Sequence, residues 1–338
     1  MVCMKKQKIL AQLTEPKNVW ELLDNWHHTL AEFIKIMNDL YKNNLIETDG
    51  SKIYLTKKGR KKLGKFISSS LCKSCKGKRI EFTKEFETLL EKYNKIVKGR
   101  PKPTLEYFQG YMRNYDVVSR VVLMNYYGDV TNKKILLVGD DDLLSIALSL
   151  TGLPSRVVVL DIDKRIGKFI NKIKKKYKLK IEFANYNVSE PLPKKFLKKF
   201  DVFSSEPLET FSGLRAFLLR GILSLKSGGI GYFGLTNLES SLKKWNKIER
   251  FLLRMNCVIT DVIRDFSIYP TVYETANYEL FTKRFNFPTE INPGIDWYKS
   301  SLFRFVLLKD PNPHNLNKKM KVKVFDPKED LTHPVLYE

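Results

Sequence analysis

Residues 133–145 combine a short apolar run, a glycine and three consecutive aspartates, and this combination constrains the fold more than any other feature of the chain. Residues 135–138 are leucine-rich and partly β-branched, which is typical of a strand buried on both faces of a sheet. Gly139 ends the run, and apolar residues resume at helical spacing over residues 143–150. A strand, a glycine turn and a helix in this order predict the first crossover of a Rossmann-like parallel sheet.

The three aspartates follow directly at the carboxyl end of this predicted strand, where such sheets place their ligand crevice. Asp140, Asp141 and Asp142 repel one another, so a loop without a function would seldom carry all three. In one alternative, a single aspartate caps the helix and the other two are solvated. We favour a crevice that binds a cationic ligand or stabilises a cationic transition state.

Two further predicted strands bring polar side chains to the same edge of the sheet. Residues 156–160 form the second strand and end at Asp161, about 20 positions beyond the glycine turn, where an acidic side chain usually binds the ribose hydroxyls of a nucleoside. Asp163 is predicted to cap the helix that follows. Residues 179–183 form the third strand, and Asn187 near its tip can accept a hydrogen bond from the amino group of adenine.

A fourth predicted strand, residues 200–205, leads into a loop that carries Glu206 and Glu209, so two more carboxylates reach this edge. Strands that alternate with helices over short turns are the pattern of a doubly wound α/β sheet. The remaining predicted elements are a helix over residues 213–225, a turn at residues 227–229, and strands over residues 230–235, 258–265 and 302–308.

The first 70 residues have the pattern of a winged-helix domain. Amphipathic helices are predicted over residues 7–13, 19–26 and 30–40, and residues 45–55 read as a hairpin with an Asp-Gly turn. Residues 56–60 would close the wing. Winged helices often read DNA through the third helix, but here that helix exposes a mixed set of charges, so a role in dimerisation or in covering the catalytic domain is equally well supported; the exposed set is Glu32, Lys35, Asn38 and Asp39.

Cys72 and Cys75 form a C-x-x-C knuckle, which is half of a zinc site. A structural zinc site needs four ligands, and Cys3 and Cys257 are isolated in the sequence. We therefore expect no metal, with Cys72 and Cys75 as weak candidates. Redox chemistry is not supported either, because no thioredoxin-like pattern surrounds the pair.

The predicted domains are a winged helix over residues 1–70, a knuckle, charged helix and proline-containing linker over residues 71–104, and a catalytic domain over residues 105–310. A charged, proline-broken tail, residues 311–338, is expected to be flexible. The aromatic segment that includes Gln109 either folds over the crevice or packs on the flank of the domain. Residues 269–298 are an aromatic-rich insertion between the last two predicted strands.

The chain carries 60 basic and 37 acidic residues, a net charge of +23. Such an excess is common in proteins that neutralise nucleic-acid phosphates. Here the lysines are spread along the chain, which also fits the lysine enrichment of proteins from hot environments. We expect only weak, unselective nucleic-acid binding. Without a signal peptide, a membrane-spanning apolar run or a disulfide framework, the sequence predicts a cytoplasmic protein.

With these residues in view, the chain resembles the branched-chain polyamine synthases of archaea and thermophiles, also called N4-bis(aminopropyl)spermidine synthases. The chain departs from the usual family pattern by having Glu206 and Asn187 where aspartates are common, and residues 113–116 in place of Thr-Pro-Glu-Thr. The resemblance rests on the winged-helix pattern, the C-x-x-C knuckle, Gln109-Gly110-Tyr111, Gly139-Asp140-Asp141-Asp142-Leu143, Val159-Leu160-Asp161-Ile162-Asp163, Pro191-Leu192-Pro193 and Glu206-Pro207-Leu208-Glu209-Thr210.

The resemblance implies an enzyme that moves aminopropyl groups from decarboxylated S-adenosylmethionine, a co-substrate, to the secondary amine of spermidine, and releases methylthioadenosine. No tightly bound cofactor is expected, and a homodimer is. Two alternatives stay open: a nucleic-acid methyltransferase that uses ordinary S-adenosylmethionine, and a non-catalytic relative that binds DNA or a partner.

For the transfer reaction we assign roles to the acidic residues at the crevice. Asp141 is the predicted base nearest the attacking amine, and Asp140 and Glu206 bind substrate amines. A carboxylate crowded by like charges has a raised pKa and is a better base. The predicted nucleoside-binding residues are Gly139, Asp140, Asp142, Asp161, Asn187 and Gln109.

Overall fold

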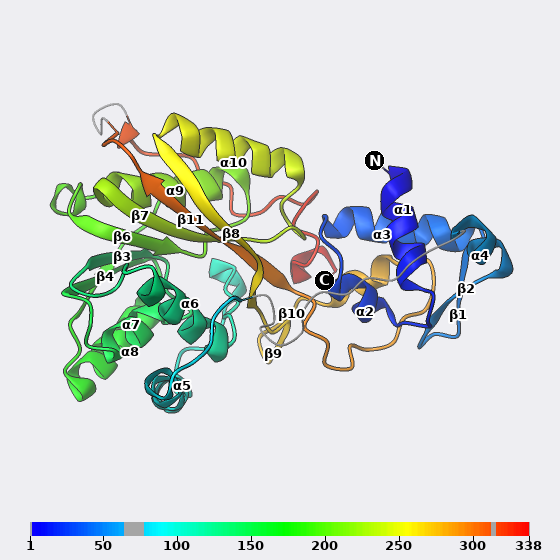
Figure 1. Ribbon diagram of the computed structural model, residues 1–338, viewed down its shortest axis with the longest axis horizontal. Helices are drawn as coiled ribbons and strands as arrows, with labels where there is room; N and C mark the ends of the chain where they lie inside the picture. Colours follow the sequence, from blue (N-terminus) through cyan, green and yellow to red (C-terminus); the bar gives the residue numbers. More distant parts are fainter. Residues whose placement is uncertain (1, 64–77, 312–315, 338) are drawn as a thin grey trace.

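The computed structural model describes residues 2–63, 78–311 and 316–337. Its centre is a seven-stranded sheet in the order β5-β4-β3-β6-β7-β11-β8 (Figure 1). The first five strands in this order are mutually parallel, and β11 is antiparallel to both of its neighbours. The predicted Rossmann-like α/β fold is therefore confirmed. The strands are β3 (Lys134–Val138), β4 (Arg156–Asp161), β5 (Ile181–Asn185), β6 (Phe200–Ser205), β7 (Leu225–Leu235), β8 (Cys257–Ile268) and β11 (Lys299–Leu307).

Helices cover both faces of the sheet because β3 is apolar on both sides. Ile135 and Leu137 pack into one hydrophobic cluster, whereas Leu136 and Val138 pack into another on the opposite face, as the alternation of side chains along a strand requires. The first cluster is covered by α5 (Lys84–Val97), α6 (Asn114–Tyr126), α7 (Leu144–Leu150) and α8 (Lys164–Tyr177), and the second by α9 (Phe211–Ser224) and α10 (Leu242–Arg254).

Residues 227–229, predicted as a turn, fall within the bounds of β7 but are not paired with either neighbouring strand. The pairing of β6 with β7 shifts register between Phe200 and Val202, and Gly228 adopts a φ of 77°. The glycines thus lie in an irregular, bulge-like segment of β7, and pairing with β6 is present before it at Leu225 and after it from Ile230. None of the helices in the part of the chain that the structure describes has the length and apolarity needed to cross a membrane.

The N-terminal unit contains the predicted helices and hairpin in the predicted order. The hairpin turn is held by Asp49, whose Oδ1 accepts hydrogen bonds from the backbone of Ser51 and Lys52. One expectation is wrong: residues 57–63, part of which was expected to close a wing, form a helix. The winged-helix assignment itself stays a prediction. The elements are α1 (Val2–Gln12), α2 (Val19–Asp24), α3 (Leu30–Lys42), β1 (Ile46–Thr48), β2 (Ile53–Leu55) and α4 (Lys57–Leu63).

The aromatic insertion between β8 and β11 packs directly against this N-terminal unit (Figure 1). The ring centroid of Trp20 lies 5.9 Å from those of Phe281 and Trp297, and Phe33 meets Phe285 at 6.2 Å. The insertion therefore ties the N-terminal helices to the catalytic sheet through a shared core. It contains β9 (Val272–Tyr273), β10 (Ala276–Asn277) and the 3-10 helix η3 (Leu280–Arg284).

The C-terminal tail was expected to be flexible, and its described residues correct that expectation. Arg220 donates a hydrogen bond of 2.7 Å to the carbonyl of Lys318, and the side-chain amide of Asn317 bonds both backbone groups of Leu192. Leu331 is 5% exposed. The tail has many lysines and few apolar residues, so its composition does not indicate that it packs against the rest of the fold. The remaining short helices are η1 (Leu105–Tyr107), η2 (Lys194–Phe196) and η4 (Pro334–Leu336).

Candidate active site

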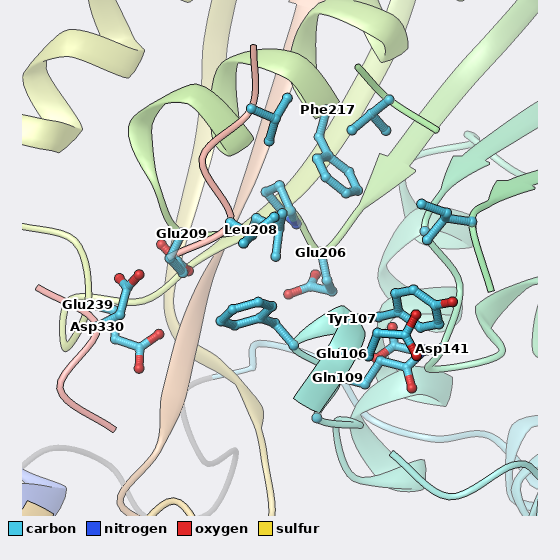
Figure 2. Close-up of a pocket in the computed structure, with 18 of the residues that line it drawn as sticks. Glu106, Tyr107, Gln109, Asp141, Glu206, Leu208, Glu209, Phe217, Glu239 and Asp330 are labelled. Atoms are coloured by element: carbon cyan, nitrogen blue, oxygen red, sulfur yellow. The ribbon is translucent and has the colours of Figure 1, made fainter. Parts of the chain in front are cut away.

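A cavity of about 870 Å³ opens at the carboxyl ends of the parallel strands. The loops after β3, β4, β5 and β6 line it, as do the segment around Gln109, the insertion and the C-terminal tail. Figure 2 shows acidic side chains at two ends of this cavity, with Glu206 between them. This is the crevice position that the strand order of a doubly wound sheet favours.

The turn between β3 and α7 depends on two residues with positive φ angles. Gly139 has a φ of 76°, and its N–H donates to the carbonyl of Leu160, which holds the turn against the tip of β4. Leu143 has a φ of 58° and a fully buried side chain. Such a conformation costs about 1–3 kcal/mol for a residue other than glycine, so the surrounding core must enforce it. The result is a tight loop that gives each aspartate a different environment.

Asp140 lies beneath the loop rather than in the cavity. Its N–H donates to Asp161, its Oδ1 accepts from the N–H of Ser145, and its Oδ2 is buried with no hydrogen-bond partner. Burial raises the pKa of Asp140 well above its usual value. The side chain is not part of the cavity lining. The expectation that Asp140 binds a substrate amine therefore does not fit its position. The sequence alone does not show which way the side chains of this loop point.

Asp142 is also buried and faces away from the cavity. Its Oδ1 accepts a 2.5 Å hydrogen bond from the N–H of Met112, and its carbonyl accepts one from the hydroxyl of Tyr93. Burial, and then the charge of Glu206, raises the pKa of Asp142 to about 7. Asp142 thus anchors the segment that contains Met112 onto the loop, and direct contact with a nucleoside does not fit this position.

Asp141 is the one member of the aspartate run that lines the cavity. Figure 2 shows it beside Gln109 and Tyr107. Burial, followed by the charges of three neighbouring aspartates, raises the pKa of Asp141 well above its usual value. A carboxyl group with a raised pKa at a cavity wall suits proton transfer.

Asp161 and Asn187, the residues expected to bind the ribose and the adenine of a nucleoside, both line the cavity. Asp161 is 8% exposed, and its two oxygens accept from the N–H groups of Asp140 and Asp163 at 2.8 Å each. Each oxygen can accept a second hydrogen bond from a ligand. Asn187 is exposed, and its Oδ1 accepts from the N–H of Ser189.

The aromatic segment before α6 folds over the crevice, and Gln109 fixes it there. The amide of Gln109 donates to Asp163 at 2.9 Å and accepts from Arg165 at 3.1 Å, and the hydroxyl of Tyr278 bonds its carbonyl. Asp163 also caps α8 as predicted, by accepting from the N–H of Arg165. Gln109 lines the cavity, but its amide group is already occupied by these protein contacts.

Glu206 lines the centre of the cavity and forms a buried ion pair that the sequence did not predict. The guanidinium of Arg120, which is 1% exposed, contacts Oε1 of Glu206, and the hydroxyl of Tyr269 donates to Oε2. Arg120 also donates to the hydroxyl of Ser267 at 3.2 Å. Glu206 therefore contributes less net negative charge to the cavity than an unpaired carboxylate would.

A second acidic group, formed by Glu209, Glu239 and Asp330, lines the far end of the cavity (Figure 2). Burial raises the pKa of all three carboxyl groups, to about 8 for Glu209 and to about 7 for Asp330. Glu239 accepts from the hydroxyls of Tyr298 and Thr332. Oδ1 of Asp330 is buried with no hydrogen-bond partner. This end is built to receive hydrogen-bond donors that carry positive charge.

Comparison with known proteins agrees with this arrangement. Residues 88–331 match the family model described as the branched-chain polyamine synthase A C-terminal domain. The chain belongs to the branched-chain polyamine synthase family. The N(4)-bis(aminopropyl)spermidine synthase of Thermococcus kodakarensis is 37% identical over 312 residues, which cover 89% of this chain and 87% of that protein. The protein of the same name from Thermus thermophilus is 32% identical over 311 residues, covering 91% of this chain and 88% of its own.

A solved structure extends the similarity to the whole fold. The crystal structure of the branched-chain polyamine synthase from Thermus thermophilus, in complex with N4-aminopropylspermidine and 5′-methylthioadenosine, superimposes with a TM-score of 0.80. The alignment covers 96% of this chain and 92% of that chain, at 29% sequence identity. The likeness includes the N-terminal unit and the tail as well as the central sheet, because so little of either chain lies outside it.

Three residues of the site were not predicted from the sequence of this branched-chain polyamine synthase family member, and only one of them had a recognisable signal. Arg120 had a signal, because it is a lone charge in the apolar run of α6. Glu239 and Asp330 had none, since one follows β7 and the other lies in the tail. Cys72 and Cys75 lie outside the described residues, so the structure does not place them. Within the described ranges, no group of three or more potential ligands could hold a metal ion.

Proposed function

We propose that this chain transfers aminopropyl groups from decarboxylated S-adenosylmethionine to the secondary amine of spermidine, forming N4-bis(aminopropyl)spermidine and methylthioadenosine. The observation that supports this most is one cavity with two acidic ends, the Asp141 and Asp161 end and the Glu239 and Asp330 end. A nucleoside that carries a cationic sulfonium, and a polyamine that carries several ammonium groups, are the ligands that such a cavity fits. The ligands of the Thermus thermophilus complex belong to these two chemical classes.

The donor nucleoside occupies the end of the cavity beside the β3–α7 turn. Asp161 accepts hydrogen bonds from the ribose hydroxyls through the lone pairs that the backbone leaves free. Gly139 allows the ligand to approach the backbone closely, and Asn187 accepts from the adenine amino group. Asp140, Asp142 and Gln109 support this end from behind, by holding the loop and the covering segment in place.

The acceptor occupies the other end, where the three buried carboxyls face the cavity. A primary ammonium group of spermidine donates to Asp330 and Glu239, and the unpartnered Oδ1 of Asp330 gains a hydrogen bond on binding. Glu206, held in place by its ion pair with Arg120, accepts a hydrogen bond from the central amine. The secondary nitrogen is thereby held between this end and the donor.

The reaction forms a carbon–nitrogen bond and breaks a carbon–sulfur bond. The lone pair of the secondary amine attacks the carbon beside the sulfonium, and the electron pair of the broken bond stays on sulfur, which becomes a neutral thioether. The proton lost by the amine moves to Asp141, whose raised pKa makes it a stronger base than an exposed aspartate. Holding both reactants in one cavity supplies much of the remaining rate enhancement.

Discrimination between two forms of the donor tests this function and separates it from methyl transfer. Ordinary S-adenosylmethionine carries a carboxylate that would face Asp141 and Glu206, and this repulsion should weaken its binding by about 2–3 kcal/mol in a partly desolvated site. Titration calorimetry of both compounds measures the difference directly. Equal or tighter binding of the ordinary form would contradict the proposal and favour a methyltransferase.

Proton release on acceptor binding provides a second prediction. At pH 7 a pKa of about 8 keeps most of Glu209 protonated and a pKa of about 7 keeps part of Asp330 protonated, whereas a bound ammonium favours the ionised forms, so these pKa values fall and protons leave. Calorimetry of spermidine binding in buffers of different ionisation enthalpy should therefore give buffer-dependent heats. Glu209→Gln should reduce the number of protons released, and heats independent of buffer would contradict this account of the acceptor end.

The expected homodimer rests on the family resemblance alone. Light scattering from the purified chain measures it, and a mass of one chain across the working concentration range would exclude it.

A further inference from the structure

A long run of positive charge lies on α8 and the residues just after it. Residues 164–180 contain nine lysines and arginines and no aspartate or glutamate. Lys168, Lys172 and Lys175 are exposed, whereas the apolar side chains of the helix pack into the core beneath β4 and β5. Their spacing of four and three residues places them on one face of the helix.

The second half of α5 adds exposed lysines beside α8, although α5 as a whole carries as many glutamates as lysines. Lys92 of α5 lies 5.6 Å from the ring centroid of Tyr177 at the end of α8. Near the other end of the pair, a side chain added at Gly99 would lie 3.7 Å from the ring of Phe169. These two contacts place the C-terminal part of α5 and the residues just after it against α8. Six exposed lysines of this region are here called the α5–α8 face: Lys92, Lys95, Lys98, Lys168, Lys172 and Lys175. Glu91 of α5 is exposed next to Lys92 in the sequence.

Within the described ranges, no ion pair joins a lysine of the α5–α8 face to an acidic side chain. The ion pair found at α8 among the described residues joins Arg165 to Asp163 in its first turn. Residues that do not pair within the fold keep their charge available to an external polyanion. Placing this much like charge on one surface also costs repulsion, which binding of a polyanion would relieve.

We propose that the α5–α8 face binds the phosphate backbone of a nucleic-acid duplex. Charge complementarity favours phosphate, and the rise of 1.5 Å per residue spreads the α8 lysines along a straight, rigid row about 10 Å long. Single strands need exposed aromatic rings for stacking, and no aromatic side chain of α5 or α8 is among the exposed large apolar residues. An anionic membrane is disfavoured, because an interfacial helix inserts its apolar face and that of α8 is buried.

This binding surface is separate from the cavity that performs the proposed transfer. The lysines of the α5–α8 face do not line the cavity. The inference therefore stands whether or not the chain transfers aminopropyl groups. It gives part of the basic excess of the sequence a defined position on the surface, whereas composition alone suggested only scattered charge.

The test uses the full chain with fluorescently labelled RNA and DNA duplexes of one sequence, and measures anisotropy between about 50 and about 200 mM salt. The patch variant is Lys168→Gln, Lys172→Gln, Lys175→Gln. The matched control is Lys243→Gln, Lys247→Gln, Arg250→Gln on α10, which removes the same charge from exposed positions of the opposite layer. Thermal unfolding of both variants reports that the fold is kept.

The wild-type chain should bind at least one of the duplexes, with log affinity falling linearly with log salt. The patch variant should lower the magnitude of that slope by up to about 2.7, since each phosphate contact contributes about 0.9, whereas the control should keep the wild-type slope. Equal losses in both variants would overturn the proposal. So would binding of neither duplex at low salt, including the case in which the chain binds vesicles of anionic lipid instead.

Discussion

Asp141→Asn should reduce the turnover number by about two to four orders of magnitude, the usual contribution of a general base. The change keeps the shape of the side chain and some of its hydrogen bonding but removes the proton acceptor at the cavity wall. Nucleoside affinity should change little, because Asp161 and Gly139 hold that ligand. The measurement is steady-state kinetics with saturating donor and a range of spermidine concentrations.

The kinetic pattern separates a base from a simple cation-binding group. If Asp141 only bound the cationic amine, the variant would raise the KM for spermidine and leave kcat nearly intact. The rate of the wild-type chain should rise with pH as Asp141 loses its proton, and this acidic limb should be absent from the variant. Asp140→Asn is the matched control. It makes the same chemical change one residue away and outside the cavity, and should cost about tenfold or less.

Arg120→Met should lower the free energy of unfolding by about 3–5 kcal/mol, because it leaves the carboxylate of Glu206 half-buried without its partner. Arg120 is 1% exposed and the side chain of Glu206 is 18% exposed, so solvent compensates little for the loss. Chemical denaturation followed by circular dichroism measures the change. Adding Glu206→Gln to the variant should restore part of the stability, since the uncompensated charge is then removed as well.

A surface pair provides the control for this prediction. Arg156 and Glu182 form an ion pair whose side chains are 41% and 39% exposed. Arg156→Met removes the same side chain and should change the free energy of unfolding by no more than about 1 kcal/mol. Similar effects of the two substitutions would contradict the view that burial makes the Arg120 pair important for stability.

Much of the central fold follows from local pattern. The apolar run before Gly139 indicated a strand buried on both faces, which the structure confirms, and the strand at residues 200–205 was located to the residue. The irregular segment expected at residues 227–229 has no partners on β6 or β11, and regular pairing with both strands begins at Ile230, as the glycine-rich pattern indicated. Helix α4 was missed, since a short lysine-rich segment has no apolar periodicity.

The part of the site that lies at the ends of the parallel strands could be predicted from the sequence. Asp141, Asp161 and Glu206 reach the cavity because strand ends in a parallel sheet share one edge. Which of three adjacent aspartates faces the ligand depends on the positive φ angles of Gly139 and Leu143, which no sequence pattern specifies. Asp330 was not predictable at all, because the tail that holds it lies more than 100 residues from β6 and is positioned by tertiary contacts such as that of Arg220 with Lys318.

The identity of the product tests the central claim most directly. The full chain is incubated with decarboxylated S-adenosylmethionine and spermidine, with linear polyamines as parallel acceptors, and the products are identified by tandem mass spectrometry. The account predicts spermidine with aminopropyl groups added at its secondary nitrogen, together with one methylthioadenosine for each group transferred. A linear product extended at a primary amine, or a methylated product without methylthioadenosine, would contradict it.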